Sequence, residues 1–478
     1  MHVKITMIIR FAATVGLLLI WGFQDGILHS NNNSSGVQSI IDKSDSLFIA
    51  QSKPITDAEW ASIIKELYSP AKDSLKKISH QYQQKHRFNG AVLVAKGGVP
   101  VYEDYFGYAD LKEQEPFDTA NRFQLASVSK QFTAVATLML QQQEKLHIDS
   151  SLAKYIPELP YHQVSIRHLL QHESGFPSYM WLIARHWEDT TPPDNNDIVK
   201  MLAEHPVRLK FTPGTRFRYS NTGYTLLAAV VERVSGQRFD NFLEENIFKP
   251  LNMNHSFAYS ASRDTLKPGM VRGFRNYGSY YSLVAENLME GALGDKNIYS
   301  TPEDLLKWMT ALNSGKVLNE NLLKKAFTPS DKNPHKINRY GMGFRIQNNE
   351  YTEKMVYHNG SWSGFRSTLR SIPEDDLTII LLSNNSFRQT GSMARSLTSA
   401  IQQDYHANSV YDIASSFVKE DEKGKSVMLS QKEAHDYRKL QAAMDGIDRE
   451  WMAHEIGEYA NKLEQQSFEW YAMNELTK

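Results

Sequence analysis

The sequence predicts an α/β (α+β) protein in which an antiparallel sheet is flanked by helices and carries an inserted all-α lobe. Strand-like patterns lie far apart in the chain, as a hairpin over residues 89–109 and as three short β-rich runs over residues 355–382. The stretch between them, from about 127 to 330, is mostly helical in pattern. A sheet built from both ends, with a helical body between, leaves a cleft at the junction, the usual place for a site.

The composition is that of one large globular unit with short extensions. Of the 478 residues, 41% are apolar and 22% charged. Lys plus Arg (53) nearly balance Asp plus Glu (54), and no basic block stands out, so we expect a small-molecule or peptide substrate and no nucleic acid. The absence of cysteine excludes disulfides, thiolate zinc sites and cysteine nucleophiles. We expect neither a metal nor a cofactor.

Residues 1–30 resemble a secretory signal peptide or an N-terminal membrane anchor. Lys4 and Arg10 precede the apolar run 11–23, in the order of a charged region followed by a hydrophobic one. The run is short for a bilayer span, yet no good small-x-small cleavage site follows it. Export to the periplasm or the extracellular space is therefore favoured, with membrane anchoring through this segment left open.

Residues 31–70 are predicted to be a linker and a lead-in helix. Asn31 to Gly36 are typical of a flexible linker, and residues 57–86 follow a helical period that breaks at Pro70. The hairpin comes next, with its turn at Gly97-Gly98.

The later strand runs are separated by Ser363-Gly364 and by the segment 373–376, which are typical turn sequences. The runs themselves are Met355 to Trp362, Phe365 to Ile372 and Leu377 to Leu382. We place the main domain at residues 71–404. Residues 405–478 follow as a charged C-terminal extension that we expect to be helical.

The first chemical motif is Ser127-Val128-Ser129-Lys130, at the start of a helix with an apolar face. Three residues apart at a helix start, the Ser127 hydroxyl and the Lys130 amine come within hydrogen-bond reach, and the Ser127 amide is among the unpaired N–H groups of the first turn. A lysine whose charge is disfavoured can activate the serine as a nucleophile. The same pattern begins at Ser69, Ser74 and Ser416, but only Ser127 follows predicted strands and opens an apolar helix.

The second motif is Tyr219-Ser220-Asn221, which lies on a loop before the helical run 224–234. A phenol near the nucleophile can relay a proton to the leaving group, and a carboxamide can orient a substrate amide. The pattern also occurs at Tyr459-Ala460-Asn461, so taken alone it is more typical of a buried tyrosine and a turn asparagine than of a catalytic pair.

The third motif is His358-Asn359-Gly360-Ser361, on a predicted strand ahead of the Ser363-Gly364 turn. A strand edge that lines a cleft can pair with an extended substrate, and Gly360 permits close approach. The backbone N–H of Ser361 can face that of Ser127 across an oxyanion hole.

Together the three motifs resemble the Ser-x-x-Lys, Tyr-x-Asn and Lys/His-x-Gly elements of class C β-lactamases, low-molecular-weight penicillin-binding proteins and the related family VIII esterases. The similarity covers roughly residues 75 to 400. It continues through residues 166–175, 217–223, 247–253, 299–305 and 340–344. The resemblance implies a β-lactamase/DD-peptidase-like fold and acyl transfer from an ester, amide or lactam to Ser127 and then to water.

The resemblance also implies a role for each site residue. Lys130 would be the general base and Tyr219 its proton-transfer partner, and which of the two takes the serine proton stays open. Asn221 would position the substrate together with Asn359, Gly360 and Ser361, and His358 would stand where the lactamases hold a carboxylate-binding lysine.

His358 is the main departure from the family pattern, because neutral imidazole is a poorer carboxylate anchor than a permanent ammonium. The sequence therefore favours an esterase or a D-amino-acid peptidase or carboxypeptidase over a true β-lactamase. The alternative is a catalytically weak penicillin-binding or cell-wall ligand-binding sensor on the same scaffold. His168 and His172 have a spacing that can hold a metal, but without a His-Glu-x-x-His pattern we expect a structural role at a helix end.

Overall fold

The computed structural model describes residues 56–278, 280–332, 338–349 and 352–404. The chain forms two compact units, Met1–Glu66 and Leu67–Lys478. The described part of the first unit belongs to helix α3 (Asp57–Leu67), and the second unit carries the site. The expected leader or anchor over residues 1–30 and the expected extension over residues 405–478 lie outside the described residues. Among the described residues, no helix combines the length and the apolar character needed to cross a membrane.

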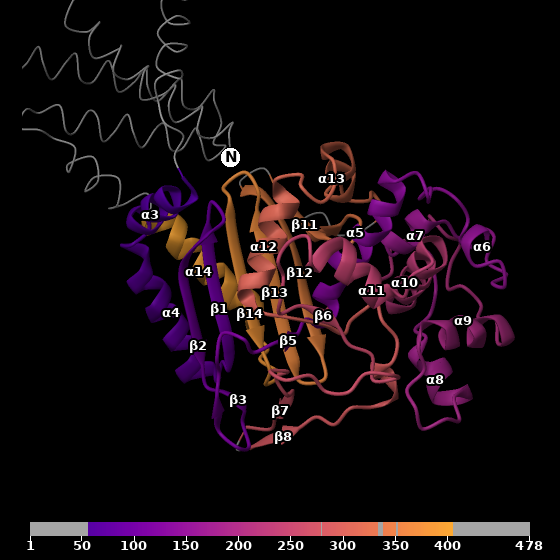
Figure 1. The fold of residues 1–478 in the computed structure, drawn as a ribbon, viewed down its shortest axis with the longest axis horizontal. Helices are drawn as coiled ribbons and strands as arrows, with labels where there is room; N and C mark the ends of the chain where they lie inside the picture. The colour runs from indigo at the N-terminus through magenta and orange to yellow at the C-terminus, as the bar shows by residue number, and fades with distance from the viewer. Residues whose placement is uncertain (1–55, 279, 333–337, 350–351, 405–478) are drawn as a thin grey trace, which may run out of the picture. The chain divides into compact units, whose positions relative to one another are not determined.

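A seven-stranded antiparallel sheet, in the order β10-β11-β12-β13-β14-β1-β2, is the centre of the second unit (Figure 1). Strands β1 and β14 join the two ends of the domain, in register from Gly90 opposite Ser383 to Lys96 opposite Leu377. The sheet is therefore assembled from both ends of the segment, as the sequence predicts. Its strands are β1 (Gly90–Lys96), β2 (Val99–Phe106), β10 (Asn338–Tyr340), β11 (Arg345–Asn349), β12 (Thr352–Trp362), β13 (Phe365–Ile372) and β14 (Leu377–Ser383).

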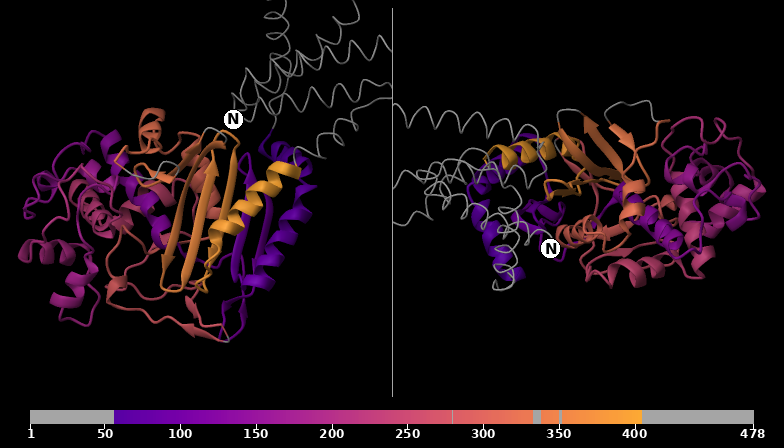
Figure 2. Two further views of the ribbon diagram at one scale, coloured as in Figure 1. Left: turned by 180° about the vertical axis from the view of Figure 1, so that it is seen from behind. Right: turned by 90° about the horizontal axis from the view of Figure 1, so that it is seen from above.

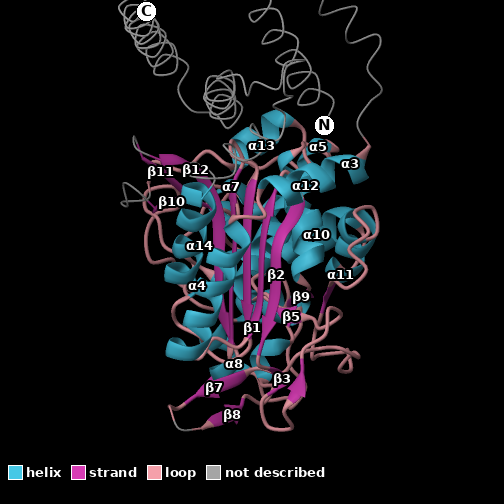
Figure 3. Cartoon of the chain, turned by 90° about the vertical axis from the view of Figure 1, so that its left-hand side faces the viewer, coloured by secondary structure: helices cyan, strands magenta, loops and turns pink. Residues whose placement is uncertain are grey.

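Helices cover both faces of this sheet, which explains why strands β1 and β14 are largely apolar. Every residue of β1 and β14 is buried, and strands buried on both faces appear as continuous apolar runs. Helices α4 (Ala71–His86) and α14 (Thr390–Asp404) pack against each other and cover one face (Figure 2). Helix α12 (Pro302–Asn313) packs on β1 and β14 from the other side (Figure 3).

Two predicted turns have the backbone geometry that their residues favour. Gly97 and Gly98 link β1 to β2 with φ values of 56° and 79°, and Ser363 and Gly364 link β12 to β13 with φ values of 40° and 88°. Positive φ at both central residues is the requirement of a type I′ hairpin turn. The predicted break at Pro70 is also present, between α3 and α4.

The segment between the two halves of the sheet forms a largely helical lobe. Its helices are α5 (Ser129–Gln142), α6 (Leu152–Tyr155), α7 (Ile166–Leu170), α8 (Met180–His186), α9 (Asn195–Glu204), α10 (Asn221–Ser235), α11 (Phe239–Leu243) and α13 (Glu320–Ala326).

Short strands also occur just before and within residues 127–330, the stretch that the sequence predicts to be mostly helical. Strand β5 (Phe123–Gln124) pairs with β9 (Ile298–Ser300), which pairs with β6 (Phe257–Ala258). A further hairpin joins β7 (Phe274–Asn276) to β8 (Tyr281–Leu283). Strands of two or three residues leave no alternation to detect in a sequence.

Helix α5 lies at the junction of sheet and lobe. Ten of the first eleven residues of α5 are buried, and the apolar ones among them belong to the core cluster. Helix α10 packs directly along α5. The turn that precedes α5 packs against β12 and β13. The N-terminus of α5 is therefore held between the sheet and the helical lobe.

Candidate active site

Ser127 lies in a tight turn that leads directly into α5. A 3-10 turn spans Ala126–Val128, and α5 begins at Ser129, two residues after the predicted start. Ala126 has a φ of 49°, in the left-handed region that residues with a Cβ atom rarely occupy. Ala126 and Val128 are fully buried, whereas Ser127 is partly exposed. Within this turn, Ser127 is therefore accessible to solvent while the residues on either side of it are buried.

Lys130 is fully buried in the first turn of α5 and faces Ser127. Its Nζ atom donates a hydrogen bond to Ser127 Oγ at 3.2 Å and another to the backbone oxygen of Asp295 at 2.7 Å. The amine and the hydroxyl are thus within hydrogen-bond reach, as the spacing in the sequence predicts.

Tyr219 and Asn221 flank the N-cap of α10. The Ser220 side chain accepts a hydrogen bond from the Gly223 N–H and thereby ends the loop that carries Tyr219. The ring centroid of Tyr219 lies 5.0 Å from Lys130 Nζ. Among the described residues, neither the buried Tyr219 hydroxyl nor the buried Asn221 Oδ1 has a hydrogen-bond partner. Buried polar groups are normally paired, so these two atoms are suited to bind a ligand.

His358 lies fully buried on β12, with its ring centroid 6.2 Å from that of Tyr219. Nε2 lies 3.0 Å from the Tyr340 hydroxyl, and Nδ1 lies 2.8 Å from the backbone oxygen of Asn359. A neutral ring protonated at Nδ1 satisfies both contacts. Burial, followed by the nearby charges of Arg345 and Lys130, holds the pKa of His358 well below its usual range. The histidine is therefore uncharged at neutral pH, as expected from the sequence.

Gly360 brings β12 against the turn that carries Ser127. A Cβ atom at this position would lie 2.2 Å from the backbone oxygen of Leu125 and 2.1 Å from Ser367 Oγ. No side chain fits there, which explains the glycine. Ser361, the next residue, is exposed. The close approach of β12 to this turn is what an oxyanion hole between the two would require. The pairing of the Ser127 and Ser361 backbone N–H groups in such a hole stays a prediction.

Asn359 is the predicted site residue whose side chain points away from the other motifs. It is exposed, and its Oδ1 accepts a hydrogen bond from Thr368 Oγ1 of the neighbouring strand. Its contribution to the site is the backbone oxygen that fixes the ring of His358.

Three aromatic side chains that the motifs do not include enclose Tyr219. The ring of His172 lies against that of Tyr219, tilted by 39° with 4.2 Å between ring centroids, and it contacts Tyr224 and Tyr340 at 4.9 and 4.5 Å. Burial and the charge of Lys130 hold the pKa of His172 well below its usual range, and its Nδ1 accepts from the Ser220 N–H. Burial likewise raises the pKa of Tyr340 and Tyr224. These neutral rings form a low-dielectric wall.

Arg345, the first residue of β11, places a cation beside this wall. Its guanidinium carbon lies 5.6 Å from the ring centroid of Tyr219 and 5.9 Å from that of Tyr340. Within the described part of the chain, its buried Nε has no hydrogen-bond partner and no carboxylate forms an ion pair with it. An unpaired guanidinium is suited to bind a carboxylate with two hydrogen bonds.

His168 has the structural role at a helix end that the sequence predicts. It is the third residue of α7, where its ring accepts from the Ser165 N–H and its own N–H donates to the Ser165 side chain. His172 lies just past the end of the same helix. Among the described residues, no three His, Cys, Asp or Glu side chains are grouped as a metal site requires.

Comparisons with known proteins identify the family and the fold of the chain. The signature of the family described as Beta-lactamase matches residues 75–403. Penicillin-binding protein 4* of Bacillus subtilis is 33% identical over 315 residues, which are 63% of this chain and 69% of that protein.

Solved structures share the same fold. A penicillin-binding protein from Bacillus halodurans is 28% identical, with a TM-score of 0.59 over 68% of this chain and 98% of that one. A D-amino acid amidase from Ochrobactrum anthropi is 21% identical, with a TM-score of 0.58 over 71% of this chain and 98% of that one. The second likeness concerns the fold alone. Because the family signature matches most of this chain, the chain belongs to the beta-lactamase family.

Proposed function

We propose that this protein is an exported serine hydrolase that cleaves an ester, amide or peptide bond through an acyl-enzyme on Ser127. The observation that carries the proposal is the 3.2 Å hydrogen bond from Lys130 Nζ to Ser127 Oγ, beside a Tyr219 hydroxyl with no partner among the described residues. A serine needs an adjacent base to be nucleophilic at neutral pH, and the buried amine is in position to be that base. Membership of the beta-lactamase family supports the same reaction class.

In acylation, Ser127 Oγ attacks the carbonyl carbon of the substrate while its proton passes to the Lys130–Tyr219 pair. The carbonyl oxygen becomes an oxyanion, which the backbone N–H groups of Ser127 and Ser361 stabilise. The tetrahedral intermediate then collapses, and Tyr219 delivers the proton to the departing oxygen or nitrogen. The product of this step is an ester between the acyl group and Ser127, with the leaving group released in neutral form.

In deacylation, a water molecule attacks the acyl-enzyme through the same groups. The water proton passes to the Lys130–Tyr219 pair, the oxyanion forms again, and the proton returns to Ser127 Oγ as the acid is released. The enclosing rings of His172 and Tyr340 exclude bulk water around Tyr219, which strengthens electrostatic interactions there.

The substrate we propose carries a carboxylate, as a D-amino-acid peptide with a free C-terminus does. His358 is neutral and both of its ring nitrogens are bonded within the protein, so it is not a strong carboxylate anchor. Arg345 supplies a permanent cation beside Tyr219. Asn221 and the strand edge at Asn359–Ser361 would hold the peptide backbone, which together with a bound C-terminal carboxylate corresponds to a carboxypeptidase activity.

Export is proposed from the sequence of residues 1–30 alone. The mature N-terminus and the cell fraction of the tagged protein test it directly. Retention of the intact protein in the cytosolic fraction would contradict export.

Covalent labelling tests the reaction itself. A fluorescent penicillin or a fluorophosphonate should label the wild type but not Ser127→Ala, and the wild type should turn over p-nitrophenyl acetate. Ser74→Ala is a matched control, because Ser74 begins another Ser-x-x-Lys sequence but lies within α4. It should label like the wild type. Labelling without turnover would support the weakly catalytic ligand-binding alternative, and the absence of both would contradict the acyl-enzyme mechanism.

A further inference from the structure

The segment Gly291–Asn297 runs beside the catalytic helix and is fixed by side chains around it. Thr133 of α5 donates to the backbone oxygen of Gly294 at 2.6 Å, and Ser129 of α5 accepts from the Ile298 N–H at 3.1 Å. Gly294 has a φ of 103°, and a Cβ atom there would lie 2.4 Å from the backbone oxygen of Tyr224. The path of this segment next to α5 is therefore closely determined.

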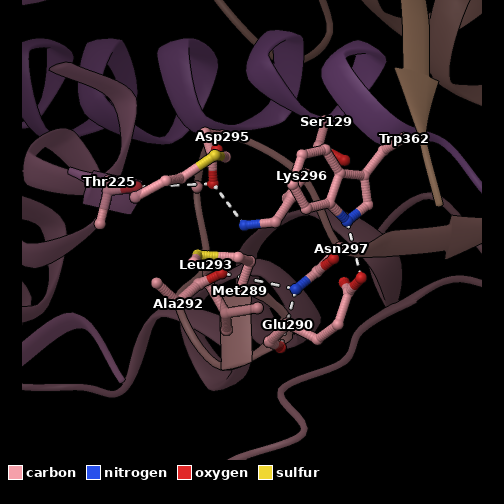
Figure 4. Close-up of polar contacts among 12 residues, drawn as sticks. Ser129, Thr225, Met289, Glu290, Ala292, Leu293, Asp295, Lys296, Asn297 and Trp362 are labelled. Atoms are coloured by element: carbon pink, nitrogen blue, oxygen red, sulfur yellow. Dashed lines mark hydrogen bonds and ion pairs between the residues drawn. The ribbon is translucent and has the colours of Figure 1, made fainter. Parts of the chain in front are cut away.

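Asp295 and Lys296 form a buried ion pair within this segment (Figure 4). Their side chains are only 1% and 2% exposed, and Lys296 Nζ lies 3.3 Å from Asp295 Oδ1. The same Nζ donates to the Tyr179 hydroxyl at 2.8 Å, and Thr225 of α10 donates to Asp295 Oδ1 at 3.4 Å. Burial, the largest single influence, would lower the pKa of Lys296, but Asp295, Tyr179 and Glu290 together outweigh it and raise that pKa. Lys296 therefore stays charged.

The ion pair is connected to the catalytic lysine through one backbone oxygen. Asp295 O accepts the hydrogen bond from Lys130 Nζ at 2.7 Å, and the same Nζ donates to Ser127 Oγ. The residue whose side chain is held by Lys296 and Thr225 thus presents the carbonyl that orients the catalytic amine. A shift of Asp295 would move the amine relative to the nucleophile.

The ion pair is also connected to β12, on the other side of Ser127. Lys296 Nζ lies 5.1 Å from the ring centroid of Trp362. Trp362 Nε1 donates to Glu290 Oε1 at 2.7 Å (Figure 4). Ser363 Oγ donates to the same oxygen at 2.6 Å. Glu290 thereby secures the type I′ turn that directly follows Ser361, the predicted oxyanion donor.

Stability is a weak reason for such a pair. Burying two charges is costly, and replacing a buried ion pair with apolar residues is often neutral or stabilising. Positioning is a better explanation here, because Asp295 and Lys296 contact one partner from each half of the site. Lys130 lies on the helix side and Trp362 on the strand side.

We propose that Asp295 and Lys296, together with Trp362 and Glu290, are positioning residues that hold the Lys130 amine and the Ser361 end of β12 in register around Ser127. This inference rests on the proposed acyl-enzyme function, to which it adds the groups that align the reacting atoms. Alignment of the base and of the oxyanion donor matters in the transition state more than in substrate binding. Loss of the network should therefore lower kcat and leave KM almost unchanged.

Lys296→Met tests the central contact. We expect kcat for p-nitrophenyl acetate, and the rate of Ser127 acylation by a fluorophosphonate, to fall about 10- to 100-fold, with KM within about threefold of the wild type. Lys96→Met is the matched control, because Lys96 forms another buried ion pair, with Asp375, at the far end of β1. The control should lower Tm and leave kcat per folded molecule unchanged.

Trp362→Phe provides a second test that leaves the ion pair intact. Phenylalanine keeps an aromatic ring over Lys296 but removes the N–H donor to Glu290, so kcat should fall about three- to tenfold with KM unchanged. This variant decides the question if Lys296→Met does not fold.

Two results separate the inference from the function on which it rests. Full activity per folded molecule in both variants, or a kcat loss in Lys96→Met equal to that in Lys296→Met, would overturn the positioning role while the acyl-enzyme mechanism stands. Failure of the wild type to acylate Ser127 would instead overturn the proposed function itself.

Discussion

At the scale of one residue, Lys130→Ala is the most direct test, because the buried Lys130 amine is the proposed base for Ser127. The variant removes the only side-chain hydrogen bond to Ser127 found among the described residues. General-base catalysis contributes about 10²- to 10⁴-fold, so labelling of Ser127 by a fluorophosphonate should slow by at least about 100-fold. The labelling rate of purified protein measures this, and a rate equal to that of the wild type would exclude Lys130 as the base.

Arg345→Met tests the proposed carboxylate anchor. A bidentate charge-assisted pair contributes about 1.5–3 kcal/mol, so KM for a D-amino-acid peptide with a free C-terminus should rise about 10- to 100-fold. The same peptide capped as an amide, and p-nitrophenyl acetate, should be hydrolysed as by the wild type. Equal losses for the free and the capped peptide would contradict the anchoring role.

Two buried neutral histidines should make the protein sensitive to acid. A histidine in the unfolded chain titrates near pH 6.5, whereas burial first, and nearby cations second, hold the pKa of His172 and His358 well below that value in the folded protein. Below pH 6.5 the unfolded state therefore binds protons that the folded state does not, so the free energy of unfolding decreases as the pH falls. Each histidine should cost about 1.4 kcal/mol at pH 5.5.

His358→Gln should remove about half of this acid sensitivity. The measurement is the difference in the free energy of unfolding between pH 8 and pH 5.5, which cancels any constant cost of the substitution. His162→Gln, at an exposed position, should show the full difference of the wild type. An unchanged difference in His358→Gln would show that this ring is protonated in the folded protein.

The sequence predicts those contacts of the site that lie within one local motif. It does not predict the contacts between residues that are far apart in the sequence. Ser127 and Lys130 are three residues apart, and their contact follows from helix geometry. Lys130 and Asp295 meet through a backbone oxygen that any residue type carries, so no sequence pattern reveals it. Arg345 follows the run 340–344 without a motif of its own, and its place beside Tyr219 depends on the pairing of β11 with β12.

At the scale of elements, the contact of β12 with the turn that carries Ser127 depends on the absence of a side chain at Gly360. Gly360→Ala would place a methyl group on the backbone oxygen of Leu125 and on Ser367 Oγ, so the strand must move away from the turn. Misplacement by about 1 Å can cost about 100-fold in rate, and we expect a loss of that size in Ser127 acylation.

Gly391→Ala is the matched control for that prediction. Gly391 lies in α14, where the nearest atoms to an added Cβ are at the ordinary distances of 3.5 and 3.8 Å. The control should keep full activity and be as stable as the wild type or more so, because alanine favours helix more than glycine by about 1 kcal/mol. Normal acylation in Gly360→Ala would show that the strand tolerates the shift.

The same contrast between local and distant signals explains which elements the sequence predicts. The strand run 365–372 coincides with β13, and the hairpin 89–109 contains β1 and β2, because each strand is long enough to show a pattern and borders a turn that contains glycine. Strands β5 and β9 pair across residues 123–124 and 299–300, where only the tertiary structure determines an extended backbone.

At the scale of the whole second unit, the core does not divide at the junction that carries the site. One cluster of buried apolar side chains includes Leu93 of β1 and Ile380 of β14, continues through Phe132 of α5, and reaches Leu182 of α8. Shared packing of this kind makes the sheet and the helical lobe depend on each other for stability. A domain with one core unfolds in a single cooperative transition, whereas two cores would give two.

Leu93→Ala in the sheet and Leu182→Ala in the helical lobe test that cooperativity. Each residue is almost fully buried, and truncating a buried leucine costs about 2–5 kcal/mol. Tryptophan fluorescence and fluorophosphonate labelling of Ser127 should lose their folded signals at the same denaturant concentration in the wild type, and at the same lower concentration in each variant. Because Ser127 lies between the two layers, a variant that loses labelling before it loses fluorescence would show that the lobe or the sheet unfolds alone, and that the site depends on a junction weaker than the shared core implies.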